Sequence, residues 1–237
     1  MVKRVIKTIR NSTREDMKSK WGIDAVILWT IQNEEVLEKL QKEGVYHANE
    51  DYLFCRDIPS IEYVYDWLSA KMTDKVGAPP SSVRYPVWAW HTWEGKREKR
   101  NLRGKGFGNK GERLVQLEIE VPDGEVVLSD FHLWVAVMNL WNLNIRSEDD
   151  AEELYKRLRE KGFELCDSLF FLEDKRVVIE DPELEALKKE VIKSWDQCFE
   201  IDAPYNDYFE GPEKSIQATF WELKIEQIRK IWHFKCR

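Results

Sequence analysis

The stretch LVQLEIEVPDGEVVLSD, residues 114–130, decides the fold class because it joins a strand, a turn and a second strand. Its first eight residues alternate between an apolar set expected to point into a core and a polar set expected to point outward, the pattern of a strand with one buried face. The two sets are Val115, Leu117, Ile119 and Val121 against Gln116, Glu118 and Glu120. The residues PDG at 122–124 favour a turn into a strand over 126–128, and Ser129 with Asp130 favours the start of a helix.

Further strands and helices flank this hairpin. Runs rich in β-branched and aromatic residues predict strands at 25–31, 45–48, 84–93 and 216–223. Helices are predicted after Asn33, after 57–59, after Ser147 and after Asp181, and a short amphipathic element is expected around 225–231. Strands and helices do not alternate regularly, and no G-x-G-x-x-G motif is present. We therefore expect a basic N-terminal arm over 1–24 and a single mixed α+β domain over 25–237, with an antiparallel-rich sheet and several packed helices.

The composition restricts the class of protein. The chain has 237 residues, 43% of them hydrophobic, which is enough to build a core and excludes wholesale disorder. No apolar stretch reaches the roughly 18 residues that a membrane-spanning helix needs, and no secretory signal is present, so a cytoplasmic protein is expected. The four cysteines form no C-x-x-C pair and no zinc spacing with histidine. Reduced thiols and no bound metal are the expectation.

Positive charge is concentrated in two segments of an acidic chain. The net charge is −7, yet residues 1–20 carry seven basic and two acidic side chains, and residues 96–113 carry eight basic and two acidic. The second segment lacks the G-x-x-x-x-G-K-[ST] spacing of a P-loop. It is either a solvated loop or a loop that folds over a phosphate-bearing ligand, with Arg97, Arg100 and Arg103 as the useful charges because guanidinium groups bind phosphate bidentately.

Eleven tryptophans predict wide aromatic surfaces in the core or around a ligand. Trp88 and Trp90 share one face of the strand YPVWAW at 85–90, directly before the basic loop. They either pack within the sheet or, together with Tyr85, stack on a nicotinamide, an adenine or another base.

Glu222 is the candidate catalytic acid. The parity of the predicted strand 216–223 puts Glu222 at the end of an apolar face, where a carboxylate is costly without a partner. The alternative is that the strand ends at Trp221 and that Glu222 lies in the first turn of a helix.

Five ordered motifs, LWTIQ at 28–32, YPVWAW at 85–90, LSDFHLW at 128–134, SWDQCF at 194–199 and QATFWEL at 217–223, resemble the bacterial family of domain of unknown function 3841. A second, looser resemblance is to ADP-ribosyltransferase-type folds. It rests on Leu28-Trp29-Thr30, a following helix, Gly44, the segment 114–130 and a late strand ending in Glu222. That resemblance implies NAD as substrate, Glu222 as the stabilising acid and the first-strand position of Thr30 as the dinucleotide anchor. ADP-ribosyltransferases have His or Arg at this position, and the hydroxyl of Thr30 makes fewer contacts than either.

Two functions follow from these observations. The first is an NAD-dependent ADP-ribosyltransferase or NAD glycohydrolase, without a metal, in which Thr30 and Gln32 anchor the ligand, Tyr85, Trp88 or Trp90 stacks on it, and Glu222 stabilises the transition state; its acceptor would be a protein or a nucleic acid. The second is a non-catalytic nucleotide- or nucleic-acid-binding module that uses loop 96–113, with Arg97 and Arg103, and exposed tryptophans. An adaptor for a partner protein is a third, plainer option.

Overall fold

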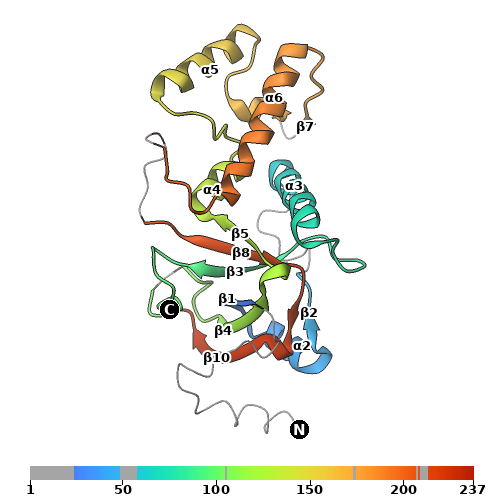
Figure 1. Ribbon diagram of the computed structural model, residues 1–237, viewed down its shortest axis with the longest axis vertical. Coiled ribbons are helices and arrows are strands. Elements are labelled where there is room, and N and C mark those ends of the chain that lie inside the picture. Colours follow the sequence, from blue (N-terminus) through green and yellow to red (C-terminus); the bar gives the residue numbers. More distant parts are fainter. Residues whose placement is uncertain (1–23, 49–57, 105, 173–174, 207, 209–212) are drawn as a thin grey trace.

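The computed structural model describes residues 24–48, 58–104, 106–172, 175–206, 208 and 213–237, so most of the expected N-terminal arm lies outside the described residues. A six-stranded sheet in the order β10-β4-β1-β3-β8-β5 forms one end of the elongated molecule, and helices form the other (Figure 1). All neighbouring strands in this sheet are antiparallel. The expected α+β class with an antiparallel sheet is confirmed.

The elements have the following bounds. The strands of the main sheet are β1 (Ala25–Asn33), β3 (Val87–Thr92), β4 (Arg113–Pro122), β5 (Val127–Asp130), β8 (Ile216–Phe220) and β10 (Ile228–Lys235). Two small sheets contain β2 (Val45–Tyr46) with β9 (Leu223–Lys224) and β6 (Phe171–Leu172) with β7 (Lys175–Arg176). The α-helices are α2 (Glu34–Glu43), α3 (Pro59–Val76), α4 (Phe131–Met138), α5 (Glu148–Glu160) and α6 (Pro182–Ser194). Short 3₁₀ helices are η3 (Asp123–Glu125), η4 (Cys166–Leu169), η5 (Trp195–Phe199) and η7 (Ile225–Gln227).

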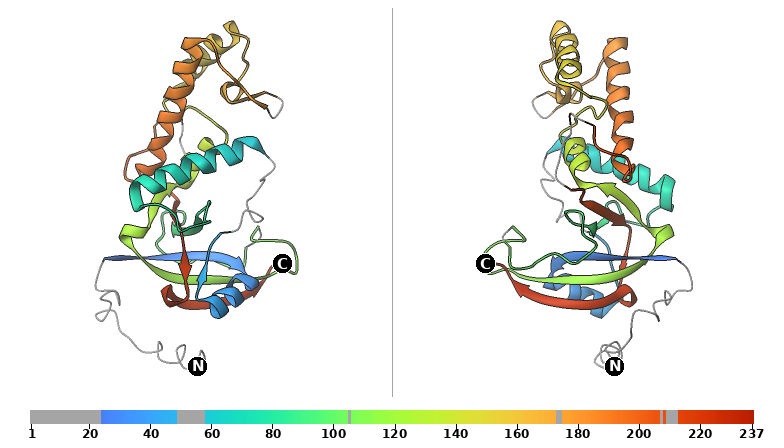
Figure 2. Two further views of the ribbon diagram at one scale, coloured as in Figure 1. Left: turned by 90° about the vertical axis from the view of Figure 1, so that its right-hand side faces the viewer. Right: turned by 60° about the vertical axis from the view of Figure 1, so that its left-hand side comes forward.

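One face of the sheet, here called the core face, packs against α2. It carries the apolar alternate residues of five strands, among them Leu28, Ala89, Leu117 and Ala218, which are at most 4% exposed. Helix α2 covers them with Val36, Leu37 and Leu40 and ends at Gly44, whose φ of 83° lies in the left-handed region that favours glycine. Figure 2 shows α2 on one side of β1, β4 and β10 and the other helices on the opposite side.

The opposite face, here called the tryptophan face, is covered partly by helices and partly by a loop. Trp88 points into a helical core built from α3, α4, α5, α6 and the turns between them, where its ring lies 5.1 Å from that of Trp134. Trp29 and Trp90, which are cross-strand partners, lie on the same face and are contacted by the loop that follows β3. The sheet therefore separates the core covered by α2 from a face shared by the helical core and this loop.

The structure corrects three local predictions. Strand β8 ends at Phe220, and Glu222 lies between it and β9, so strand parity does not place the Glu222 carboxylate. The amphipathic element expected at 225–231 is the turn η7 followed by the long edge strand β10. Gln116 and Glu118, expected to point into solvent, are 1% and 8% exposed because the tryptophan face is covered.

Candidate functional site

Loop 96–113 lies over the tryptophan face and is fastened at both ends. At its start, the Gly95 amide donates to the Lys214 carbonyl at 2.9 Å, and at its end the Gly111 amide donates to the Cys236 carbonyl at 2.9 Å. Both glycines have φ values in the left-handed region, 73° and 91°, where a side chain is strained. The loop therefore leaves and rejoins the sheet at fixed points.

Cationic side chains of this loop lie on aromatic rings of the tryptophan face. The Cζ atom of Arg97 is 5.6 Å from the ring centroid of Trp29, and the Nζ atom of Lys99 is 5.2 Å from that of Trp232. Arg100 is held most closely, with Cζ 3.7 Å from the Trp93 centroid. Each such cation–π contact contributes about 0.5–1 kcal/mol at an exposed site. Aromatic rings, rather than carboxylates, contact these three cationic side chains.

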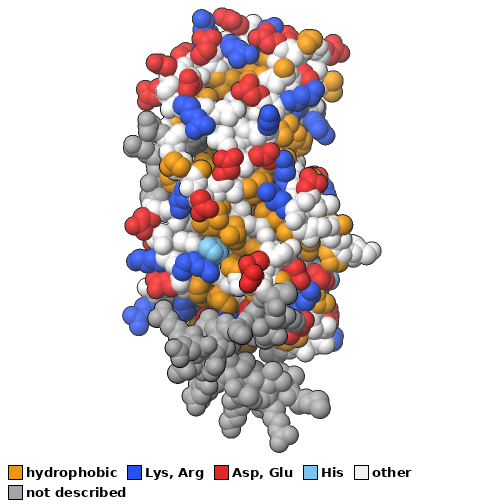
Figure 3. Space-filling model, viewed as in Figure 1, with side chains coloured by type: hydrophobic (Ala, Val, Ile, Leu, Met, Phe, Trp, Pro, Cys, Tyr) orange, Lys and Arg blue, Asp and Glu red, His pale blue; other side chains and the backbone are white. Residues whose placement is uncertain are grey.

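Four positive charges of the loop lack acidic partners, whereas Arg113 at its end pairs with Glu34 at 2.7 Å. In the part of the chain that the structure describes, no carboxylate forms an ion pair with Arg97, Lys99, Arg100 or Arg103. Some arginines elsewhere are paired: Arg84 meets Glu62 at 2.7 Å, and Arg159 meets Glu152 at 2.6 Å. On the face seen in Figure 3, acidic and basic side chains are intermingled over the helical end.

Partial burial lowers the pKa of both Arg97 and Arg100, because desolvation disfavours the charged form. Arginine nevertheless stays protonated in proteins, so both side chains carry a full positive charge. Burial lowers the pKa of His91 to about 4, with a further contribution from the charge of Arg97, so this imidazole is neutral at physiological pH.

A row of cross-strand partners runs across the tryptophan face below the loop: Lys230, Glu118, Trp29, Trp90, Gln217 and Ser129. Within it the Glu118 carboxylate accepts hydrogen bonds from the Trp29 indole at 3.4 Å and from the Lys230 ammonium at 2.9 Å. These bonds fix the Trp29 ring against the sheet. Gln116, two residues before Glu118 on the same face, is the cross-strand partner of Trp232.

Several polar atoms on this face are buried without a hydrogen-bond partner. Neither the Oε1 nor the Nε2 atom of Gln116 has one, and the same holds for Gln217 Oε1 and Ser129 Oγ. A buried polar group without a partner costs about 1–3 kcal/mol, so such groups are rare in folded proteins. Gln227, also 1% exposed, shows the ordinary case, since its side-chain oxygen accepts from the Lys224 amide at 2.8 Å.

The structure brings some of the predicted ligand residues together. Trp90 lies beneath Arg100, with Cζ 5.7 Å from the ring centroid, and Arg97 lies over Trp29 in the same layer. Arg103 is exposed on the loop. Trp88, although on the same face, packs among Tyr65 and Trp134 in the helical core.

Thr30 and Gln32 lie on the core face instead. The Thr30 hydroxyl, 1% exposed, donates to the Trp88 carbonyl at 2.7 Å and accepts from the Gln32 amide at 2.7 Å. Tyr85, 4% exposed, packs edge-on against Tyr65. The hydroxyl expected to anchor a dinucleotide is thus engaged within the sheet, on the side away from Trp90.

Glu222 lies beside the small β2–β9 sheet. A 2.8 Å hydrogen bond joins its Oε1 atom to His47 Nε2, and its Oε2 atom is 3.6 Å from Lys224 Nζ. The bond from His47 lowers the pKa of Glu222, with a further contribution from Lys224. This carboxylate is therefore ionised and paired in the structure, and its expected role in NAD chemistry stays a prediction.

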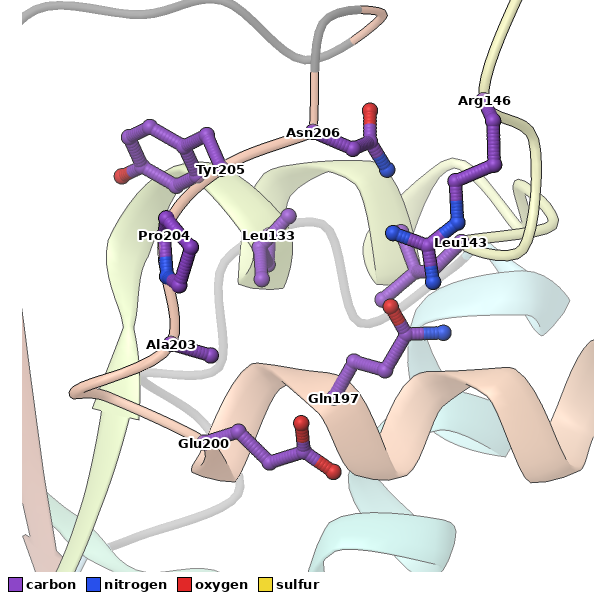
Figure 4. A pocket seen from close by; sticks show the side chains of 9 residues that line it. All are labelled: Leu133, Leu143, Arg146, Gln197, Glu200, Ala203, Pro204, Tyr205 and Asn206. Atoms are coloured by element: carbon purple, nitrogen blue, oxygen red, sulfur yellow. The ribbon is translucent and has the colours of Figure 1, made fainter.

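Cavities in the described part of the structure lie elsewhere. One of about 30 Å³, walled by α4 and the segment 203–206, has room for little more than water (Figure 4). Near it, the Tyr205 hydroxyl donates to the fully buried Asp130 carboxylate at 2.9 Å. A larger cavity of about 320 Å³ opens between the start of α3 and the end of α4. Neither is lined by a predicted site residue, and the described residues include no group of three side chains able to hold a metal ion.

The family model for a domain of unknown function, DUF3841, matches residues 27–229, which include β3, β4, β5, β8, the whole loop, most of β1 and the first two residues of β10. The chain belongs to the DUF3841 family. No curated protein and no solved structure matches it. In this DUF3841 chain, no helix of the described residues is long and apolar enough to cross a bilayer.

The site of this DUF3841 domain includes residues that the sequence alone did not single out. Trp29, Trp232 and Gln116 come from three strands, and only the register of β1, β4 and β10 places them beside one another. Period-two alternation does put Trp29 on the face opposite Leu28, which was the one available signal. Nothing local to Gln116 distinguishes a covered polar face from a solvated one.

Proposed function

We propose that this domain binds nucleotides at the tryptophan face, with loop 96–113 holding the phosphate and the tryptophans stacking on the base. The observation that carries the proposal is the layer of unpaired cations, Arg97, Lys99 and Arg100, resting on the rings of Trp29, Trp232 and Trp93. Guanidinium and ammonium groups without acidic partners attract phosphate, and indole rings stack on bases. The two halves of a nucleotide thus find complementary groups within one layer.

The distribution of charge limits the kind of ligand. The chain as a whole has a net charge of −7, which disfavours broad binding along a nucleic acid backbone. Separate tryptophan rings suit unpaired bases better than the stacked interior of a duplex. Free nucleotides and single-stranded nucleic acid share this chemistry, and the experiment separates them.

The test measures the affinity of the whole chain for the four ribonucleoside monophosphates and for short single-stranded DNA and RNA over a range of salt concentrations. Each phosphate that is neutralised in a single strand adds about 0.7 to the slope of log K against log salt. The double variant Arg97→Gln/Arg100→Gln should therefore reduce that slope by up to about 1.4.

A matched control changes the net charge equally. Arg157 and Arg159 of α5 are paired with Glu183 and Glu152, far along the chain from the loop, so Arg157→Gln/Arg159→Gln should leave the slope unchanged. Binding of oligonucleotides but not of monophosphates would identify the ligand as a single strand. An equal slope in both double variants, or no binding by the unaltered protein, would overturn the proposal.

A further inference from the structure

Gln116 lies on the tryptophan face, on the strand next to the edge strand β10, and neither polar atom of its side chain has a partner among the described residues. The side chain is 1% exposed, and neither its oxygen nor its nitrogen has a hydrogen-bond partner in the described structure. A terminal amide presents one acceptor and two donors in a single plane. Burying all of them without partners is unfavourable for the free protein, so the arrangement points to a group that supplies the partners when it binds.

The neighbours of Gln116 define the shape of that group. Trp232 is its direct partner on β10, and directly paired residues in an antiparallel sheet have Cβ atoms about 4.5–5.5 Å apart. The exposed side of the Trp232 ring is covered by Lys99 of the loop. A planar ligand that replaced Lys99 on this ring would bring its edge to the Gln116 amide.

We infer that Gln116 recognises the hydrogen-bonding edge of an adenine base stacked on Trp232; this inference rests on the nucleotide-binding function proposed above. Adenine presents an amino donor at N6 beside the acceptor N7, and a glutamine amide pairs with both at once. The oxygen of Gln116 accepts from N6, and its nitrogen donates to N7. Both polar atoms of the Gln116 side chain then have hydrogen-bond partners.

The loop takes part by exchanging its contacts. Lys99 and the neighbouring arginines leave the rings and bind the phosphate of the same nucleotide, while the base takes their place over the indole. The fixed points at Gly95 and Gly111 keep the loop over the site during this exchange. Nothing covalent changes, and no co-reactant is needed.

The test compares two oligonucleotides that differ by one group: an adenine single strand and the same strand with unsubstituted purine, which lacks the N6 amino group. The unaltered protein should prefer adenine by about tenfold or more, since one good bidentate pair discriminates by roughly that factor. Gln116→Met should bind both strands equally while keeping its salt slope, because the phosphate contacts remain. Gln197→Met, a change at a half-buried glutamine paired with Asn144, serves as the matched control and should keep the preference.

The outcomes separate this inference from the function on which it rests. If the unaltered protein binds both strands with salt dependence but without preference, adenine recognition is refuted and nucleotide binding stands. A preference for another base, or a preference that survives in Gln116→Met, also refutes it. If the unaltered protein binds neither strand, adenine recognition is refuted, and if it also binds none of the four monophosphates, the proposed function itself is refuted. The comparison of the two strands needs no variant, so a folding defect in Gln116→Met would not prevent the decision.

Discussion

Replacing Gln116 by methionine should stabilise this protein, whereas the same replacement at Gln227 should destabilise it. The two glutamines are buried to the same degree, each 1% exposed; Gln116 lies on β4, and Gln227 lies in the turn η7 just before β10. They differ in their hydrogen bonds. Gln116 has no partner for either amide atom, while Gln227 accepts a hydrogen bond of 2.8 Å from the Lys224 amide.

The magnitudes follow from the cost of unpaired groups. Burying the unpaired amide of Gln116 costs about 1–3 kcal/mol, and Gln116→Met removes part of that cost. Methionine fills a similar volume, so no cavity is left. Gln227→Met instead leaves the Lys224 amide without its acceptor, which costs about 1–3 kcal/mol. For a chain of this size, each kcal/mol shifts the melting temperature by about 2–4 °C. We expect Gln116→Met to melt a few degrees above the unaltered protein and Gln227→Met a few degrees below it.

Urea unfolding followed by far-ultraviolet circular dichroism measures both changes, with equal m values as the check that the unfolded states are comparable. Circular dichroism is preferable to fluorescence because Trp232 neighbours one of the altered positions. If Gln116→Met lost as much stability as Gln227→Met, the Gln116 amide would have partners in the free protein. An amide that is already paired in the free protein would not await a ligand.

The remaining predictions concern stability away from the loop. Glu222→Gln should cost less than about 1 kcal/mol at neutral pH, because its pair with His47 is partly exposed and solvent screens it. Because His47 lowers the pKa of Glu222, the stability that the pair contributes is present above the ordinary glutamate pKa and is lost as pH falls through the lowered value. Urea unfolding of the unaltered protein and of Glu222→Gln over an acid series should therefore give free energies of unfolding that converge at low pH. Tyr205→Phe removes a donor from the buried Asp130 carboxylate and should cost about 1.5–3 kcal/mol in the same assay, and a loss within error would contradict the role of that bond. Leu158→Ala, at a fully buried position of the helical core, should cost about 2–5 kcal/mol in thermal unfolding, and a near-neutral result would place Leu158 outside the core.

Element ends were predictable wherever the chain carries a local chemical signal. Asp130 and Asp181 each accept hydrogen bonds from amides of the first helical turn, as expected of N-cap residues. Ser147 does the same for α5, and Gly44 ends α2 in the left-handed conformation. These features depend on a few consecutive residues, so the sequence contains them completely.

The final strand could not be identified in this way. Ile225, Ile228 and Ile231 are spaced by three, which suggests one face of a helix, and only pairing with β4 selects the extended backbone of β10. A bulge between Ile228 and Lys230 further breaks the alternation that would mark a strand. Long-range pairing decides such a segment, and a single sequence does not encode it visibly.

The candidate site was predictable only in part, for the same reason. The basic loop and Trp90 were singled out because they are close in sequence. Trp29 and Trp232, which the loop also contacts, are about 70 and 130 residues away from it. Gln116 was expected in solvent because alternation along β4 reports which residues share a face but not what covers that face.

The energetics of the loop explain why cations rest on the tryptophans of the free protein. Without them, Trp29, Trp90, Trp93 and Trp232 would present an exposed aromatic patch prone to association. Each cation–π contact is worth only about 0.5–1 kcal/mol, whereas a base stacked on an aromatic side chain contributes about 1–3 kcal/mol. In the proposed complex, a nucleotide would therefore gain more from a ring than the cation would lose, and the freed cation would gain a phosphate contact. Cation–π contacts that are weaker than base stacking would cover the rings in the free protein and still be replaced by a nucleotide. Buried ion pairs would hold the loop too firmly for this exchange.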